Sequence, residues 1–200
     1  YRSKKYTKLN IENLIPFIKN IDARKSLALI IALIFLDQVV KFYIKLNYPL
    51  TIGESPIIDI GFFKLLFIEN KGMAMGASLN TLLPFLDDNT AKLILTLFRI
   101  VACIGLGFWL RNMIKKKASQ LLIFCLCLIL AGAIGNLIDS VFYGVIFSSS
   151  YGQVATLFPE VGYAPLFYGS VVDMIQFPLA TWIWPEWLPI IGGQEYTFFE

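Results

Sequence analysis

Three long apolar runs alternate with polar, turn-rich segments along this 200-residue chain. The runs cover about residues 26–46, 91–110 and 119–142, and each has the roughly 20 residues that a helix needs to cross a bilayer. They predict three transmembrane helices. We therefore expect a basic arm over residues 1–25, followed by one membrane-embedded domain over residues 26–200.

The segments outside these runs carry turn and strand signals. Residues 47–90 contain several Pro and Gly residues around the apolar stretch Phe62–Glu69, which predicts a small β element. Residues 143–200 contain a turn-rich part and then a tryptophan-rich run, typical of a segment lying in the headgroup layer (Trp182, Trp184 and Trp187). The expected fold class is an all-α polytopic membrane protein with a small extracytoplasmic β element and an interfacial segment.

Basic residues gather at two places and predict the orientation of the chain. Seven Lys and Arg residues precede the first run, and four more lie between the second and the third (Arg111, Lys115, Lys116 and Lys117). The positive-inside rule places both clusters in the cytoplasm, so the N-terminus is expected inside and residues 47–90 and 143–200 outside. Because each cluster flanks an apolar run, the charges indicate membrane lipids as neighbours and not nucleic acid.

The composition excludes a soluble domain and histidine-dependent chemistry. Hydrophobic residues make up 57% of the chain and charged residues 16%, against about 25% charged in soluble domains, and the mean hydropathy is +0.68. There is no histidine, which removes Ser–His and Cys–His catalysis and the common zinc sites. Cys125 and Cys127 are two residues apart in an apolar run, so they point to different faces of a helix, and no metal site is expected.

One carboxylate stands alone near the end of the chain. Asp173 lies in the apolar stretch Gly169–Phe177, and the last basic residue of the chain is Lys117. A lone aspartate is often a solvated loop residue or a helix cap. In a membrane protein, an acid in apolar surroundings also indicates a functional site at which the fold supplies a second polar group.

Charged residues interrupt the first two apolar runs. Asp37 and Lys41 are four residues apart and lie on one helical face, where an ion pair and a functional site are both open. Arg99 lies within the second run and needs an acceptor, for which Asp37 and Asp139 are candidates. A charge at the bilayer centre costs about 2.5–3.5 kcal/mol on insertion scales, so these residues are expected to face a polar interior or the interface.

The third run ends in a stripe of small and polar residues. Ala131, Gly135 and Asp139 follow at intervals of four, with Gly132 and Asn136 on the adjoining row. The small residues favour close helix packing. Packing does not explain Asn136 and Asp139, which need polar partners in lipid.

Four short segments in chain order carry polar residues at fixed spacings. They read Asp-Gln-x-x-Lys from Asp37, Asn-Lys-Gly-Met-Ala-Met-Gly from Asn70, Gly-Asn-x-x-Asp from Gly135 and Val-Val-Asp-Met from Val171. In this order they resemble the motifs of the lipoprotein signal peptidase family, also called signal peptidase II. Members of this family are intramembrane aspartic proteases that remove the signal peptide from bacterial prolipoproteins.

The resemblance implies a role for each matched residue. Asp173 matches one of two catalytic aspartates. Four other residues match positions around the family's substrate cleft (Asn70, Gly72, Asn136 and Asp139). Asp37 and Lys41 match the first-helix positions. Together with Arg99, which belongs to none of the four motifs, they are expected to be structural polar residues.

Two departures from the family pattern change these expectations. The family usually has arginine after the aspartate that matches Asp139, whereas this chain has Ser140. The second catalytic aspartate belongs to a motif that opens a fourth helix, and we expect it beyond Glu200, because Phe198–Glu200 resembles the lead-in to that motif. The 200 residues alone are then expected to be inactive, with Asp139 as the alternative second aspartate.

Two further features concern the start of the chain and the version of the family that it resembles. It begins at Tyr1, so it is expected to be a fragment at its N-terminus as well. The long insert between Asp139 and Asp173, and the tryptophan-rich run after it, resemble the Bacteroidetes-type version of the family.

The function implied by the resemblance is cleavage of a prolipoprotein just before its diacylglyceryl-modified cysteine. Two carboxylates that share one proton suffice for such chemistry, so no metal or cofactor is expected. The implied setting is the bacterial inner membrane, with the site at the outer face and the cyclic peptide globomycin as an inhibitor. A monomer is expected, because nothing in the sequence requires a larger assembly. The alternatives are a proton-coupled transporter or relay subunit, which would be expected to show internal repeats that the sequence lacks, and a non-enzymatic scaffold.

Overall fold

The computed structural model describes residues 20–50, 56–72, 85–178, 180–183, 185–187, 193 and 195–198. Most of the basic arm and the glycine-punctuated segment from Met73 to Ala77 lie outside these residues. The chain divides into two compact units. The first contains residues 1–37 and 99–135, and the second contains residues 38–98 and 136–200.

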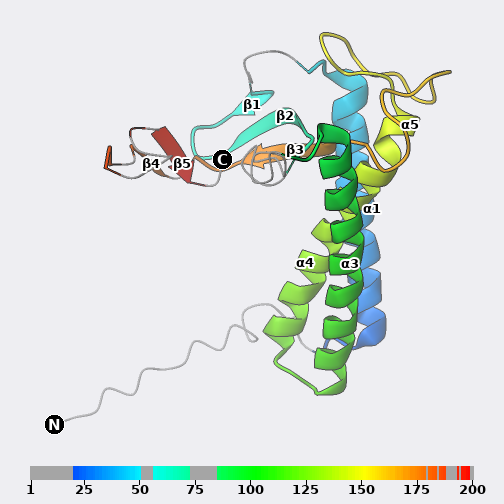
Figure 1. Cartoon of the computed structure of the whole chain (residues 1–200). Coiled ribbons are helices and arrows are strands. Elements are labelled where there is room, and N and C mark those ends of the chain that lie inside the picture. The colour runs from blue at the N-terminus through cyan, green and yellow to red at the C-terminus, as the bar shows by residue number, and fades with distance from the viewer. Residues whose placement is uncertain are drawn as a thin grey trace. The chain divides into compact units, whose positions relative to one another are not determined.

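Three long apolar helices account for about half of the described residues (Figure 1). They are α1 (Ala23–Asn47), α3 (Asp88–Lys115) and α4 (Gln120–Ile138); α4 continues through the π-helical turn η4 (Asp139–Tyr143) and α5 (Gly144–Ile146). Within the described residues, three helices are long and apolar enough to cross a membrane. The predicted fold class, a polytopic membrane protein with three such helices and a small β element, is confirmed.

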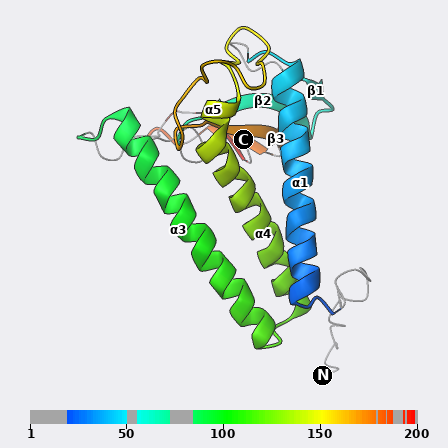
Figure 2. The same cartoon turned by 90° about the vertical axis from the view of Figure 1, so that its right-hand side faces the viewer.

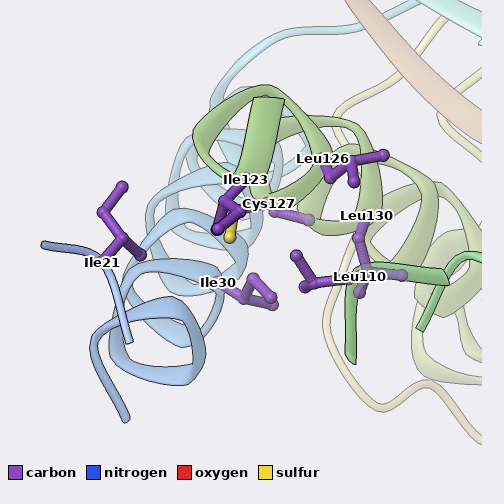
Figure 3. Packing of buried hydrophobic residues seen from close by; sticks show 8 residues of the cluster. Ile21, Ile30, Leu110, Ile123, Leu126, Cys127 and Leu130 are labelled. Atoms are coloured by element: carbon purple, nitrogen blue, oxygen red, sulfur yellow. The ribbon is translucent and has the colours of Figure 1, made fainter. Parts of the chain in front are cut away.

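The first unit has an apolar core between its helices. Its buried residues come from α4 at spacings of three and four, from α1, from α3 and from the residues before α1 (Ile21, Ile30, Leu110, Ile123, Leu126, Cys127, Leu130 and Ala131). Figure 3 shows these side chains as sticks. This spacing is that of one helical face. Cys127 is buried and Cys125 is exposed, so the two thiols lie on different faces as predicted.

Small residues on α4 permit close approach in this unit, as the sequence predicts. A β-carbon placed on Gly135 would collide with the carboxylate of Asp37 on α1. Gly132 is different, because a β-carbon there would meet nothing within 4 Å. Of this pair, only Gly135 lies in close contact with α1, and a larger residue there would have to displace the Asp37 carboxylate.

The second unit contains a three-stranded antiparallel sheet in the order β1-β2-β3, seen beside α5 in Figure 2. Its strands are β1 (Ile58–Asp59), β2 (Lys64–Asn70) and β3 (Val171–Gln176), and a separate hairpin pairs β4 (Ala180–Ile183) with β5 (Glu195–Phe198). The predicted β element is thus present at β2. The sequence did not predict that the Asp173 stretch forms its partner strand.

The second unit also has its own core, which joins α1 to the sheet and to the insert after α5. The residues are Ile44, Phe67, Tyr143, Phe147, Ala155 and Val172. The rings of Tyr143 and Phe147 meet edge to face with centroids 4.9 Å apart. This core packs the C-terminal end of α1 against β2 and β3, so that polar side chains of α1 can reach residues of the sheet.

Candidate active site

Asp173 and Asn70 form a polar pair on one face of the sheet. In the antiparallel register Ile68 lies opposite Asp173 and Asn70 lies opposite Val171, which makes Asn70 and Asp173 diagonal neighbours on the same face. The Asn70 side-chain amide donates to Asp173 Oδ2 at 3.1 Å, and its oxygen accepts from the Gly72 N–H at 2.8 Å. Asp173 therefore has the second polar group that its sequence surroundings led us to expect.

A buried ion pair between Lys41 and Asp139 lies next to β3. Lys41 on α1 donates to Asp139 Oδ2 at 2.6 Å and to Asn136 Oδ1 at 3.0 Å, and both Lys41 and Asp139 have at most 2% of their side chains exposed. The same carboxylate accepts from the main-chain N–H of Val172 at 3.2 Å. Asp139 thus connects α1 to the residue immediately before Asp173.

The other oxygen of Asp139 belongs to a second chain of hydrogen bonds. Gln38 donates to Asp139 Oδ1 at 3.1 Å and accepts from the Tyr143 hydroxyl at 3.0 Å. Asp139 and Tyr143 begin and end the π-helical turn η4, and both are fully buried. Turns of this kind are rare and occur frequently at functional sites. Here the turn places both side chains toward Gln38.

Gly169 allows the chain to return from the insert across this turn. Its N–H donates to the carbonyl of Ser140 at 2.9 Å, and a β-carbon at this position would collide with the carbonyl oxygen of Asp139. It would also lie 3.0 Å from the main-chain nitrogen of Gly144. Backbone atoms cannot move aside as a flexible side chain can, so this position requires glycine.

Gly169→Ala is accordingly expected to lower the free energy of unfolding by about 1–3 kcal/mol through overpacking. The measurement is the thermal unfolding midpoint of the purified protein in detergent. Gly132→Ala is the matched control, because the new methyl group meets nothing and alanine favours a helix. A Gly169→Ala midpoint equal to that of the wild type would contradict the proposed close contact.

A second buried lysine reaches the opposite face of the sheet. Lys45 Nζ lies 2.5 Å from Glu69 Oε1 and 2.9 Å from Ser150 Oγ, and the Lys45 side chain is fully buried. Three aromatic rings surround its ammonium group at 5.0–5.7 Å from their centroids (Phe67, Phe147 and Tyr163). Sequence reasoning missed this pair, although Lys45 follows Lys41 by four residues and so lies on the same helical face.

Tyr163, from the insert, supports the start of β3. Its hydroxyl accepts from the Ser170 N–H at 2.8 Å, and burial raises the pKa of the Tyr163 phenol from 10.0 to about 12. The neutral phenol is therefore the form that the folded protein favours.

Tyr163→Phe is expected to make stability less sensitive to alkaline pH. The unfolded phenol loses its proton near pH 10 and the folded phenol near pH 12, so between these values the unfolded state binds fewer protons and stability falls as the pH rises. The measurement is the thermal midpoint of both proteins at pH 9 and pH 11. The wild type should lose more than the variant, and equal losses would contradict the shift.

The structure also describes the other residues that the sequence singled out. Asp37 packs against Gly135, and Arg99 lies half-buried on α3, where its predicted partner stays a prediction. Ser140, where the resemblance has arginine, is fully buried, and its hydroxyl donates to the Asn136 carbonyl at 3.0 Å. Within the described part of the chain, no three Asp, Glu or Cys side chains gather into a group that could hold a metal ion.

Comparison with known proteins gives a consistent assignment. A sequence profile described as Signal peptidase (SPase) II matches residues 29–191. The lipoprotein signal peptidase of Porphyromonas gingivalis is 46% identical over 175 residues, covering 86% of this chain and 71% of that protein. The lipoprotein signal peptidase of Amoebophilus asiaticus is 33% identical over 169 residues, covering 82% of this chain and 64% of that protein. No solved structure is significantly similar to the chain.

The profile match spans all four motifs that carried the resemblance. The profile covers the helix with Lys41, the strand with Asn70, the turn with Asp139 and the strand with Asp173. The prediction of the family is confirmed, and the chain belongs to the signal peptidase II family.

Proposed function

We propose that this chain is the membrane-embedded part of an intramembrane aspartic endopeptidase that removes the signal peptide from diacylglyceryl-modified prolipoproteins. Cleavage falls just before the lipidated cysteine. Relatives named lipoprotein signal peptidase support the substrate class. The observation that carries the proposal is the placement of Asp173 on β3. Asp173 accepts a hydrogen bond from Asn70, and the N–H of the residue before it, Val172, donates to Asp139.

The proposed reaction is hydrolysis of one peptide bond by water between two carboxyl groups. One is ionised and takes a proton from the attacking water, and the other is protonated and donates a hydrogen bond to the scissile carbonyl. The tetrahedral intermediate then collapses, the C–N bond breaks, and a proton passes to the leaving amine. Two close carboxyl groups share a proton because both cannot ionise, so neither a metal nor a cofactor is required.

Asp173 is the proposed first carboxyl group, and an aspartate beyond Glu200 is the proposed second. Asp139 is the alternative, but its carboxylate is fully buried and is engaged by Lys41, Gln38 and the Val172 N–H. A group without access to water is poorly placed to activate it. We therefore assign Asp139 a positioning role, with Asn70, Gly72 and Asn136 as substrate-cleft residues.

The proposed setting is the bacterial inner membrane, with the N-terminus in the cytoplasm and the site at the outer face. Three spans with basic segments before α1 and between α3 and α4 support this orientation. A substrate anchored by its diacylglyceryl group would enter laterally from the lipid. We propose a monomer that acts alone and is inhibited by globomycin in the same cleft.

A cleavage assay with a matched substrate pair tests this function. The protein, extended to its natural end and purified in detergent, is incubated with one prolipoprotein in its diacylglyceryl-modified and unmodified forms, and the products are separated on a gel. We expect cleavage of the modified form only, abolished by globomycin. Failure to cleave the modified form, or equal cleavage of both, would overturn the proposal.

A further inference from the structure

The register of β2 against β3 decides whether Asn70 can reach Asp173. Side chains alternate between the two faces of a strand, so Glu69 and Asn70 point to opposite faces. Glu69 lies opposite Val172, which is buried, and Asn70 shares its face with Asp173. A slip of one residue would exchange these faces.

No short-range feature of the sequence sets the register of β2 against β3. The bonded residues Asn70 and Asp173 are 103 positions apart, so no tight hairpin turn joins the strands. The pairing itself contains two registers that differ by one residue. Lys64 lies opposite Gln176 in the first, and Ile68 lies opposite Asp173 in the second, with the irregularity between Leu65 and Ile68. Continuing the first register would place Ile68 opposite Val172 and would turn Glu69, in place of Asn70, toward Asp173.

One buried contact distinguishes the two arrangements. Lys45 extends from α1 to Glu69 at 2.5 Å on the face opposite Asp173, and Ser150 of the insert contacts the same ammonium group at 2.9 Å. In the slipped register Glu69 would leave Lys45 and would approach the Asp173 carboxylate. Both changes cost free energy, since a buried charge loses its partner and two like charges come together.

We propose that Lys45 is a positioning residue that, through Glu69, fixes the register of β2 and β3 and so holds Asn70 against Asp173. The inference rests on the proposed peptidase function. Lys45 and Glu69 meet on the face of the sheet opposite the one that carries Asn70 and Asp173. Their effect on cleavage passes through the placement of Asn70, which distinguishes them from residues that only stabilise the fold.

The test uses a variant that removes the ion pair without leaving an unpaired buried charge. Lys45→Met/Glu69→Leu replaces both partners by apolar residues of similar size, a change that buried ion pairs often tolerate without loss of stability. In the extended protein we expect a folded enzyme with nearly unchanged KM and a kcat lowered about 10- to 100-fold by misplacement of the site. Lys45→Arg, which keeps the charge, should retain most of the activity.

A double-mutant cycle separates positioning from general stability. On an Asn70→Ala background the same two substitutions should lower kcat by less than about twofold, because the contact that they maintain is already absent. Lys64→Met is the matched control, since Lys64 pairs with Asp59 at 3.6 Å on the same sheet and is partly exposed. It should leave kcat unchanged.

The outcomes separate this inference from the proposed function. If Asp173→Asn is inactive but Lys45→Met/Glu69→Leu has the wild-type kcat, or if its effect adds fully to that of Asn70→Ala, the positioning role is wrong and the peptidase stands. If Asp173→Asn cleaves as fast as the wild type, the proposed function itself is wrong. Should the double variant fail to fold, full activity of folded Glu69→Gln would equally overturn the positioning role.

Discussion

Asp173→Asn is expected to lower the rate of prolipoprotein cleavage by roughly 10²–10⁴-fold, the range that one group in acid–base catalysis contributes. Asparagine has nearly the same shape, and its amide oxygen can still accept the hydrogen bond that Asn70 donates at 3.1 Å. The sheet should therefore keep its structure while the group that exchanges a proton with water is lost. The measurement is kcat on the diacylglyceryl-modified substrate with the protein extended to its natural end.

Asp59→Asn is the control for this prediction. Asp59 also lies on the sheet, where its carboxylate accepts from the Gly61 N–H at 2.9 Å and pairs with Lys64, but it is exposed and on a different strand. It should leave kcat within about a factor of two, as expected for a surface change away from the site. Equal activity of Asp173→Asn and Asp59→Asn would remove Asp173 from the mechanism.

Lys41→Met is expected to cause the largest loss of stability, about 3–5 kcal/mol, because it leaves the Asp139 carboxylate buried without its cation. The loss should appear as a lower unfolding midpoint in detergent and as a lower yield of folded protein. Cleavage should fall as well, since Asp139 also accepts from the N–H of the residue before Asp173.

Removal of both charges should restore part of this loss. In Lys41→Met/Asp139→Asn no ion remains unpaired, so its unfolding midpoint should lie between those of the wild type and Lys41→Met. Lys64→Met, which breaks an exposed ion pair, should change stability by less than about 1 kcal/mol. A Lys41→Met protein as stable as Lys64→Met would contradict the importance of the buried pair.

The helices could be predicted from sequence because their signals are local. A run of about 20 apolar residues specifies a span without reference to the rest of the chain. The close contact at Gly135 was also predictable from the spacing of small residues on α4. The boundaries were less predictable. The second helix was predicted over residues 91–110, but α3 covers Asp88–Lys115, because polar residues such as Arg111 continue the helix past its apolar part.

The partners within the site could not be predicted because they are distant in sequence. The spacing of Asp37 and Lys41 gave no indication that Lys41 forms an ion pair with Asp139, 98 residues away. The six residues of β3 show no clear alternation, so nothing local distinguished a strand from a loop. The motifs singled out Asn70 and Asp173 as candidates but gave no indication of the hydrogen bond between them.

The two buried lysines of α1 also have a consequence for biosynthesis. Lys45 leaves the ribosome 24 residues before Glu69, and Lys41 leaves it 98 residues before Asp139. Until Glu69 exists, the Lys45 ammonium group at one end of the first span must remain hydrated or reach the headgroups. The first helix therefore cannot reach its final burial during its own insertion, and its C-terminal end is completed only when the third span has been synthesised.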